Sequence, residues 1–366
     1  MRPPGGTGLP GAGWRLGGVA VLLAVAAVFP LVFTNPVITN YGVFALIFAG
    51  AASAWNLFSG YSGYISLGHA VFFGSGAYTV GIAAKAWHLT GLAVFGLLPL
   101  AAAVAVAIAV PFGLVALRVR RHTFIVVTIA VFFIFQLMAY NLSFTGGTTG
   151  LSAPFLNWQA ASYNDPFYYI ALVIVVAAVA LSWLVRRSRF GLQLRAIRDD
   201  EDRARGLGVR AMRVKLGAFA ISAAFTGLLG GVWFYYLTQV QPPSGFDPLF
   251  DLSIALMTFF GGIGSLSGPV LGALIIEPGQ LYLTTRFTNG YVSEILLGAI
   301  FLLVILLLPR GVIPTATERI TAWRAARARQ APAPPDAGPE GQAGAGEGTG
   351  PGAVDGPAVR TGGTPR

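Results

Sequence analysis

Cysteine is absent from the 366 residues, and charged side chains make up only 10% of the chain. Without thiols the protein has no disulfide framework, no thiolate metal site and no cysteine nucleophile. Soluble globular domains carry about 25% charged residues. A chain that is 55% hydrophobic, with a mean hydropathy of +0.69, could not cover a surface in water. The composition therefore excludes a soluble domain and indicates an integral membrane protein.

Lysine is almost absent as well, since the only two are Lys85 and Lys215. The phosphate loop that binds ATP has the pattern G-x-x-x-x-G-K-[ST], with Ser or Thr directly after the lysine. Here Ala86 and Leu216 stand in that position. Any ATP hydrolysis that drives this protein must therefore come from another chain. We expect no catalytic residue, no metal ligand and no cofactor in this one.

Long apolar runs are what the chain has in abundance. They fall at residues 14–33, 41–58, 68–84, 91–117, 123–140, 167–185, 215–238, 252–276 and 291–309. About 20 apolar residues in a helix cross the hydrocarbon core of a bilayer, and in lipid the backbone must satisfy its own hydrogen bonds. The sequence predicts an all-α membrane protein, a polytopic bundle of about eight to ten transmembrane helices spanning residues 14–310.

Two of these runs are interrupted, at 59–69 (SGYSGYISLGH) and at 261–269 (GGIGSLSGP). Glycine costs about 1 kcal/mol in a helix interior and proline about 3 kcal/mol, so both segments are predicted helix breaks or re-entrant turns. Tight helix packing on small residues is the alternative. Paired interrupted segments point to a substrate pathway in transporters. The candidate pathway residues there are Ser62, Ser66, Gly68, His69, Gly261, Gly262, Gly264 and Ser265.

Basic residues predict the orientation, because cytoplasmic loops of membrane proteins are rich in Lys and Arg. Ten of the 24 Lys and Arg residues lie between Arg186 and Lys215, and seven lie from Arg310 onward. We therefore expect the loop 186–215, the N-terminus 1–13 and the tail 311–366 on the cytoplasmic side. The tail is rich in Pro, Gly and Ala and is predicted to be disordered. The run 252–276 must then enter and leave on the outer side as a broken hairpin, which places Asp247 and Asp251 on an outer loop.

The loop 186–215 is too long and too charged for a simple turn. Its acids at 199–202 are followed by Arg203 and Arg205, which can pair at i,i+3 and i,i+4 on a short helix, and Gly206 and Gly208 can end it. This predicts a surface helix over 195–209. It either docks a soluble partner or is a solvated loop that touches anionic lipid headgroups.

The same loop resembles the coupling loop of ATP-binding-cassette (ABC) importer permeases, and more specifically that of the branched-chain amino acid permeases of the LivM and LivH type. Their loop reads R-A-I-R-E-N-E-x-A-A-x-A-L-G-I. The matching or substituting residues are Arg195, Arg198, Asp199, Asp200, Glu201, Ala204, Leu207 and Gly208. Three further segments resemble the family: 63–78 (its S-L-G-H-A element), 145–151 (its T-G-G-x-x-G-L element, with Gly146 and Gly147) and 261–269.

The resemblance implies a permease subunit that forms the translocation pathway, in a bacterial cytoplasmic membrane with both termini cytoplasmic. It implies a second homologous permease, two cytoplasmic ATPases that use the ATP, and an extracytoplasmic binding protein, with no nucleic acid. The eight loop residues are expected to couple the permease to the ATPases, and Gly146 and Gly147 join the candidate pathway. Branched-chain or related small amino acids are the expected cargo.

Two alternatives stay open. An ion-coupled secondary transporter of a small solute would need ionisable groups at mid-membrane, of which the central runs have almost none. His69, the only histidine within an apolar run, either hydrogen-bonds neighbouring helices or serves the pathway. One departure bears on the cargo: Phe133 stands near a position where family members often carry Glu.

Overall fold

The computed structural model describes residues 12–153, 163–286, 295, 298–299 and 302, all within one unit, Met1–Arg319. The predicted run at 291–309, apart from four residues, and the predicted tail at 311–366 lie outside the described residues, as does most of the N-terminus 1–13.

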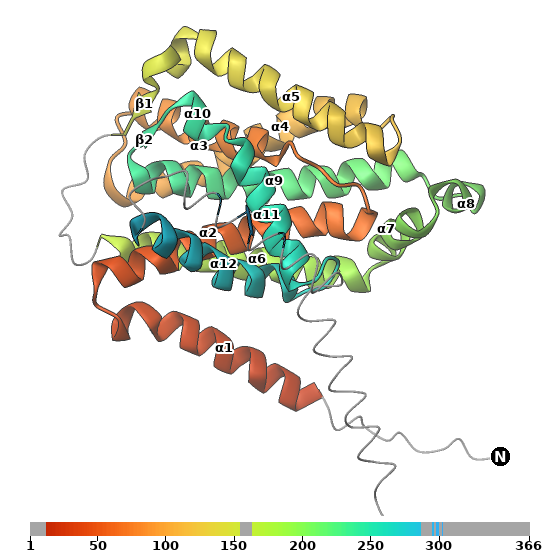
Figure 1. Ribbon diagram of the computed structural model, residues 1–366, viewed down its shortest axis with the longest axis horizontal. Helices are drawn as coiled ribbons and strands as arrows, with labels where there is room; N and C mark the ends of the chain where they lie inside the picture. The colour runs from red at the N-terminus through yellow and green to blue at the C-terminus, as the bar shows by residue number, and fades with distance from the viewer. Residues whose placement is uncertain (1–11, 154–162, 287–294, 296–297, 300–301, 303–366) are drawn as a thin grey trace, which may run out of the picture. The chain divides into compact units, whose positions relative to one another are not determined.

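The described residues form almost only helices (Figure 1). The long helices are α1 (Ala12–Val32), α2 (Pro36–Trp55), α3 (His69–Ala86), α4 (Leu98–Ala116), α5 (Arg121–Asn141), α6 (Asn164–Arg187), α9 (Ala211–Leu237), α11 (Pro248–Gly261) and α12 (Gly268–Arg286). The shorter helices are α7 (Arg189–Asp199), α8 (Glu201–Gly206) and α10 (Pro242–Gly245), with the irregular turns η1 (Asn56–Gly60), η2 (Gly91–Leu97), η3 (Ser143–Thr145) and η4 (Gly147–Thr149). The strands β1 (Leu151–Ser152) and β2 (Gln239–Val240) form one short antiparallel pair. The all-α prediction is confirmed.

Five helical segments of the described chain are long and apolar enough to cross a membrane. They are Pro36–Gly60, Gly91–Ala116, Arg121–Asn141, Asn164–Arg187 and Ala211–Leu237. Each coincides with a predicted run. The runs at 14–33, 68–84 and 252–276 also form helices, α1, α3 and the pair α11–α12.

Glycine lets the central helices approach closely, as is common where helices pack in lipid. A Cβ added to Gly76 on α3 would lie 2.1 Å from the carbonyl oxygen of Gly227 on α9. One added to Gly230 on α9 would lie 1.9 Å from the carbonyl oxygen of Phe73 on α3. Backbone therefore packs on backbone in the middle of the bundle, and larger side chains are excluded there.

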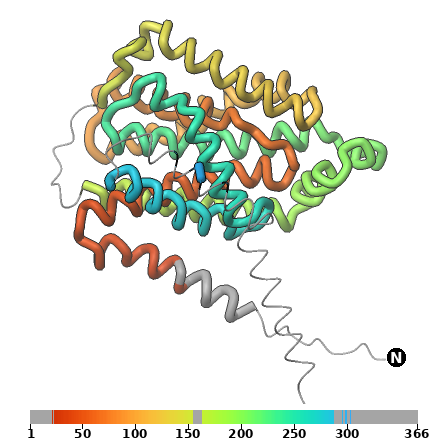
Figure 2. The backbone as a smooth tube through the Cα atoms, viewed as in Figure 1, coloured from red at the N-terminus to blue at the C-terminus, as the bar shows by residue number. Residues whose placement is uncertain are grey.

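Both predicted helix breaks are present. After α2 the helix widens into the π-turn η1, and from Gly63, with φ +73°, to Gly68 the chain is not helical until α3 begins. Between α11 and α12 the chain reverses at residues 262–267 (Figure 2), where Gly262 and Gly264 have φ values of +113° and +77°. A Cβ on Gly261 would lie 1.8 Å from the carbonyl oxygen of Gly268, so the two arms of this hairpin touch at its turn.

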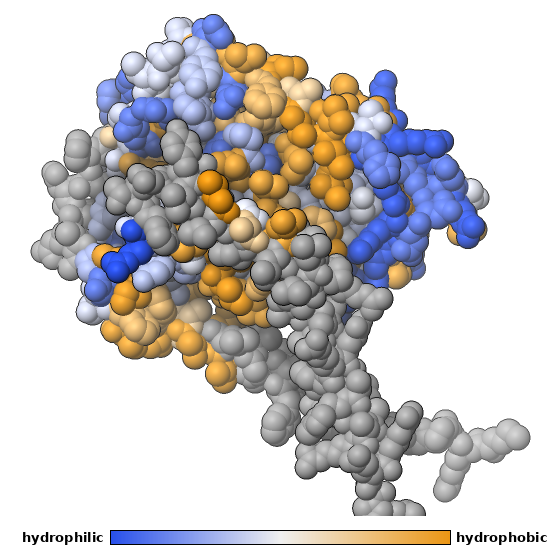
Figure 3. All heavy atoms as spheres, viewed as in Figure 1, coloured by the Kyte–Doolittle hydropathy of each residue, from blue (hydrophilic) through white to orange (hydrophobic). Residues whose placement is uncertain are grey.

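Polar side chains gather at one end of the bundle. Figure 3 shows hydrophilic residues over α7 and α8, beside a broad hydrophobic surface on the neighbouring spans. Arg121, the first residue of α5, contacts α7 at this end of the bundle. The loop after α5 contains β1, which lies at the opposite end. The 21 residues of α5 separate these two ends by about 30 Å, given a rise of about 1.5 Å per residue.

Candidate functional site

The loop 186–215 forms a helical corner, α7–α8 (Arg189–Gly206), on the polar end of the bundle. The predicted single helix over 195–209 is wrong, because Asp200 interrupts it. Asp200 has an extended φ of −154°, and its Oδ1 accepts a hydrogen bond from the backbone N–H of Arg203 at 3.0 Å. An aspartate in this geometry caps the N-terminus of a new helix instead of continuing the old one.

The charge pairs predicted within this loop are confirmed. Arg203 Nε lies 3.0 Å from Asp200 Oδ2, at i,i+3, and Arg205 Nη2 lies 2.5 Å from Glu201 Oε1, at i,i+4. Helix α8 ends at Gly206, and Gly208 follows with a φ of +86°. A left-handed residue just beyond a helix end is a position that glycine fills without strain.

The α7–α8 corner has an outer and an inner face. Leu207 is 87% exposed, and Asp199 and Gly208 are also exposed. Ile197 and Ala204 are buried, and Arg198 is partly buried beneath them. The residues predicted to couple the chain to a partner therefore divide between a surface that a partner could touch and a surface that contacts the bundle.

Arg198 joins this corner to both helix breaks. Its Nη1 donates a hydrogen bond to the carbonyl oxygen of Gly60 at 2.8 Å. A Cβ on Gly264 would lie 2.5 Å from the same nitrogen, so a larger residue there would displace the guanidinium. Beside them, Asn56 Nδ2 donates to the carbonyl oxygen of Ser265, and Asn56 Oδ1 accepts from the N–H of Gly264, both at 2.8 Å. We call this meeting of α7, Asn56–Tyr64 and residues 262–265 the junction.

Glu201 forms a second connection between the corner and the spans. Its Oε2 accepts a hydrogen bond from Tyr64 Oη, and its Oε1 lies 2.9 Å from Lys215 Nζ on α9. Lys215 is 1% exposed and also donates to the carbonyl oxygen of Leu117, after α4, at 3.3 Å. Burial raises the pKa of Glu201, but hydrogen bonds from Tyr64 and Lys215 and the charges of Lys215 and Arg205 hold the pKa below the ordinary value of 4.5. Glu201 is therefore the ionised partner of a buried ammonium.

Arg121, at the start of α5, closes the set of contacts. Its Nη2 donates to the carbonyl oxygens of Ile197 at 2.7 Å and Arg198 at 2.6 Å. These are among the last carbonyls of α7, which have no partner within the helix and carry partial negative charge. Through these few side chains the corner is attached to η1, to the end of α4, to α5, to α9 and to the hairpin turn.

Four of these connecting residues were not predicted from the sequence: Asn56, Tyr64, Arg121 and Lys215. Lys215 carried a usable signal, because a lysine that begins a long apolar run needs a partner when it is buried. Asn56 and Tyr64 act through partners that are between 137 and 209 residues away, and nothing near them in the sequence marks this.

The pathway candidates Ser62, Ser66, Gly68 and His69 lie in and after the first break, and all are buried. His69 is fully buried and bonds to Ser66 Oγ through Nδ1 at 3.1 Å and to Ser222 Oγ on α9 through Nε2 at 2.7 Å. Because Ser222 donates its own proton to the carbonyl oxygen of Ala54, it accepts from Nε2–H. Ser62 Oγ accepts from the N–H of Tyr64. His69 thus makes the hydrogen bonds of the first alternative, and its role in a pathway stays a prediction.

The second set of pathway candidates divides. Gly261, Gly262, Gly264 and Ser265 form the hairpin turn at the junction, with Ser265 Oγ donating to the carbonyl oxygen of Gly262 at 2.6 Å. Gly146 and Gly147, with φ values of +77° and +57°, lie instead at the start of η4, at the other end of α5. The structure does not bring them to the junction.

Asp251 is not on an outer loop, contrary to the expectation. It lies in the first turn of α11, is 2% exposed, and its Oδ1 accepts from the N–H of Ala70 at 3.1 Å. Helix α3 has no capping side chain of its own at Gly68. A carboxyl group from another helix therefore satisfies one of its free N–H groups.

Within the described ranges, no group of three or more His, Asp or Glu residues is placed to hold a metal ion. The arrangement is mechanical: an exposed helical corner is tied by charged side chains to two breaks in membrane helices. Such broken helices border substrate sites in membrane transporters.

Comparison with known proteins identifies the class as a transport permease. The chain belongs to the family described as the permease component of branched-chain amino acid transport systems, which matches residues 37–305. It is 28% identical to the high-affinity branched-chain amino acid transport system permease protein LivM of Salmonella typhimurium, over 82% of this chain and 75% of the relative. Identity to LivM of Escherichia coli is also 28%, over 82% of this chain and 76% of the relative. The fructose import permease protein FrcC of Rhizobium meliloti is 25% identical over 39% of this chain and 41% of its own length. No solved structure matches this chain.

Proposed function

We propose that this chain is the membrane-channel subunit of an ABC-type importer and that its α7–α8 corner couples it to cytoplasmic ATPases. A second homologous permease completes the pathway, two ATPases bind beneath the corner, and an extracytoplasmic binding protein delivers the cargo. The observation that supports this proposal is that the corner has an outer and an inner face. Leu207 on the outer face is 87% exposed, while Arg198 and Glu201 on the inner face contact the helix breaks and α9.

Movement of the corner is transmitted because its contacts are made to backbone and to a buried charge. If the ATPases displace α7, Arg198 must either carry Gly60 with it or leave that carbonyl without its donor. Hydrogen bonds to charged groups contribute about 1.5–3 kcal/mol, so carrying the helix break along is the less costly outcome. The glycines at Gly63, Gly262 and Gly264 adopt φ values that only glycine reaches easily. They are suitable hinges for two alternative arrangements of the spans.

ATP itself is bound by the partner subunits, since this chain has no phosphate loop. The permease contributes the translocation pathway and the α7–α8 corner that couples it to the ATPases. A coupling element transmits work only if the protein has two conformations that the ATPases favour differently. The two breaks that meet at the junction supply a place where such a change can occur without disrupting helix hydrogen bonds.

The proposed cargo is a branched-chain or related small amino acid. This rests on the relatives named LivM, which match most of the chain, whereas FrcC matches a smaller part. Phe133, near the position where the family resemblance places a Glu, is 47% exposed on α5. Its side chain does not enter the buried interior of this chain, so the departure does not by itself remove a buried carboxylate from the pathway.

One observation favours the alternative, an ion-coupled secondary transporter. Asp251, Glu277, Lys215 and His69 are buried, so ionisable groups are present inside the bundle after all. Three of them have structural partners: Lys215 pairs with Glu201, His69 with two serines, and Asp251 with the start of α3. Those contacts support a structural role for these three groups, so the ABC-type importer remains the better-supported hypothesis.

The proposal is tested by crosslinking in native membranes, because the chain has no cysteine to remove first. Leu207→Cys places a thiol on the outer face of the corner, and Leu92→Cys, at a residue 67% exposed in η2, is the matched control at the other end. We expect the first variant to crosslink to an ATPase that carries a phosphate loop, and the second to give no such adduct. Adducts of Leu207→Cys with lipid alone would contradict the coupling role.

A further inference from the structure

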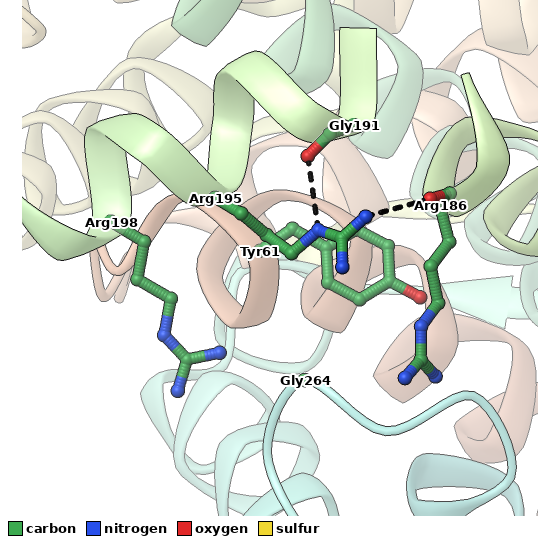
Figure 4. Close-up of a pocket in the computed structure, with 6 residues that line it drawn as sticks. All are labelled: Tyr61, Arg186, Gly191, Arg195, Arg198 and Gly264. Atoms are coloured by element: carbon green, nitrogen blue, oxygen red, sulfur yellow. Dashed lines mark hydrogen bonds between the residues drawn. The ribbon is translucent and has the colours of Figure 1, made fainter. Parts of the chain in front are cut away.

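Two neighbouring cavities at the polar end of the bundle are lined by arginines. The first, of about 210 Å³, is lined by Tyr61, Arg186, Gly191, Arg195, Arg198 and Gly264 (Figure 4). The second, of about 420 Å³, is lined by Trp183, Arg186, Arg187, Arg195 and Leu266. Arg186 and Arg195 line both, so we treat the two cavities as one site and call it the arginine pocket.

The arginines of this pocket have no acidic partner within the described part of the chain. The ion pairs found there involve only Arg203, Arg205 and Lys215. Arg195 donates instead to the carbonyl oxygens of Arg186, at 3.0 Å, and Gly191, at 3.4 Å. An arginine has five N–H donors, so most of the donors around this pocket remain available to a ligand.

Tyr61 adds an independent sign that a ligand is accommodated. Its side chain is 4% exposed, and its hydroxyl has no hydrogen-bond partner among the described residues. Figure 4 shows the hydroxyl directed toward the Arg186 side of the cavity. Buried hydroxyls are normally hydrogen-bonded, and this one lies where an acceptor held by the arginines would complete it.

An anion suits this pocket, because the positive charges of the arginines that line it repel each other until a counter-charge is bound. Phosphate suits guanidinium groups, which can donate to it in pairs. The wall beside the arginines is apolar: Trp183 is 41% exposed, and the guanidinium of Arg187 lies 4.1 Å from its ring centroid. Tryptophan is enriched at the membrane–water interface, so the phosphate is best presented there on a lipid.

We propose that the arginine pocket binds the phosphate of an anionic phospholipid from the leaflet that the α7–α8 corner faces. The bound headgroup bridges Arg186 at the end of α6 to Arg195 and Arg198 on α7, directly beside Gly264 of the hairpin turn. It neutralises the charge that gathers where the corner meets the helix breaks. Basic pockets between membrane helices on the cytoplasmic side are known lipid sites in general. This binding is separate from the proposed transport and can be measured on the chain alone.

The test counts lipids bound to the purified full-length chain by native mass spectrometry, with phosphatidylglycerol and phosphatidylcholine offered in turn. Arg186→Gln removes a pocket charge that makes no side-chain hydrogen bond in the described structure, and Tyr61→Phe removes only a hydroxyl. Arg213→Gln, at an exposed residue on α9 outside the pocket, is the matched charge control. One basic residue near an anionic surface accounts for about fivefold in binding.

We expect wild type to retain phosphatidylglycerol but not phosphatidylcholine. Retention should fall about fivefold in Arg186→Gln, by a smaller factor in Tyr61→Phe, and not at all in Arg213→Gln. Equal retention of both lipids, or an equal loss in the control, would overturn the proposal. Displacement of the lipid by millimolar inorganic phosphate would overturn the lipid assignment in favour of a soluble anion. If Arg186→Gln does not fold, Tyr61→Phe decides, and unchanged retention in it would count against the site.

Discussion

Replacing Glu201 with glutamine is the perturbation whose effect can be worked out most fully from the contacts. The variant keeps the size of the side chain and one acceptor oxygen but removes the negative charge beside Lys215. That ammonium is 1% exposed, and its other contacts are the Leu117 carbonyl at 3.3 Å and the ring of Tyr64, whose centroid is 4.1 Å away. Neither of these can replace a carboxylate as a counter-charge.

The expected loss is about 3 kcal/mol in the free energy of unfolding. Removing one partner of a fully buried ion pair costs about 3–5 kcal/mol, because the other charge is left uncompensated. Here the carboxylate side chain is 14% exposed and the glutamine still accepts a hydrogen bond, so the low end of that range applies. Asp202→Asn, an exposed neighbour on the same helix, removes an equal charge and should change stability by less than about 0.5 kcal/mol.

The measurement is equilibrium unfolding in mixed detergent micelles, monitored by tryptophan fluorescence. It is made for wild type, Glu201→Gln, Lys215→Met and the double variant, which together form a double-mutant cycle. The double variant should recover most of what Glu201→Gln loses, because the unpaired buried charge is gone, and the coupling energy should be about 1–3 kcal/mol. Additivity of the two single changes within about 0.5 kcal/mol would refute the reasoning. It would mean that Glu201 and Lys215 do not interact as described.

Three further outcomes follow from the junction and the corner. Gly264→Ala puts a Cβ 2.5 Å from a guanidinium nitrogen at a φ of +77°, so uptake by the assembled complex should fall several-fold while ATP hydrolysis continues. The control Gly279→Ala, whose Cβ meets nothing within 4 Å, should transport normally. Equal uptake rates in the two variants would show that the turn has no part in coupling. Gly208→Pro forces a φ near −65° where the chain has +86°, so uptake should be lost with membrane insertion intact, as a comparison of uptake with protein in the membrane fraction would reveal. Because the pKa of Glu201 is lowered in the folded state, its ionised form stabilises the fold at pH values above the ordinary pKa of 4.5. This contribution is lost as the pH falls through the lower, folded-state pKa. Unfolding titrations should show this acid sensitivity in wild type and less of it in Glu201→Gln.

The helices could be predicted because their cause is local. Apolar runs of spanning length must be helical in lipid, and glycines at 261–264 break the run 252–276 whatever surrounds it. The split at Asp200 was missed although its cause is also local, because an aspartate three residues before a helical arginine was interpreted as a pairing partner and not as a cap. The start of α11 was also missed, because Asp247 was expected on a loop: it caps the helix, and Pro248 is the first residue, a common helix-start signature.

The site could be predicted only in pieces. The corner, the first break and the hairpin turn were each singled out, but nothing in the chain shows that Arg198 reaches Gly60 and Gly264, since those contacts depend on how the helices pack. The burial of Asp251 has a similar origin: its partner, the N–H of Ala70, is 181 residues away and belongs to a helix that lacks its own cap.

Uptake by the reconstituted complex, isolated through a tag on this chain, distinguishes an ATP-driven importer from an ion-coupled transporter. A labelled branched-chain amino acid would be added outside the proteoliposomes. Transport would be driven either by ATP on the side of the α7–α8 corner or by a proton or sodium gradient. Proteoliposomes that contain this chain alone would be the second sample. We expect uptake only by the complex and only with ATP, and we expect it to be lost when the phosphate-loop lysine of the ATPase is replaced. Gradient-driven uptake by this chain alone would contradict it and establish a secondary transporter.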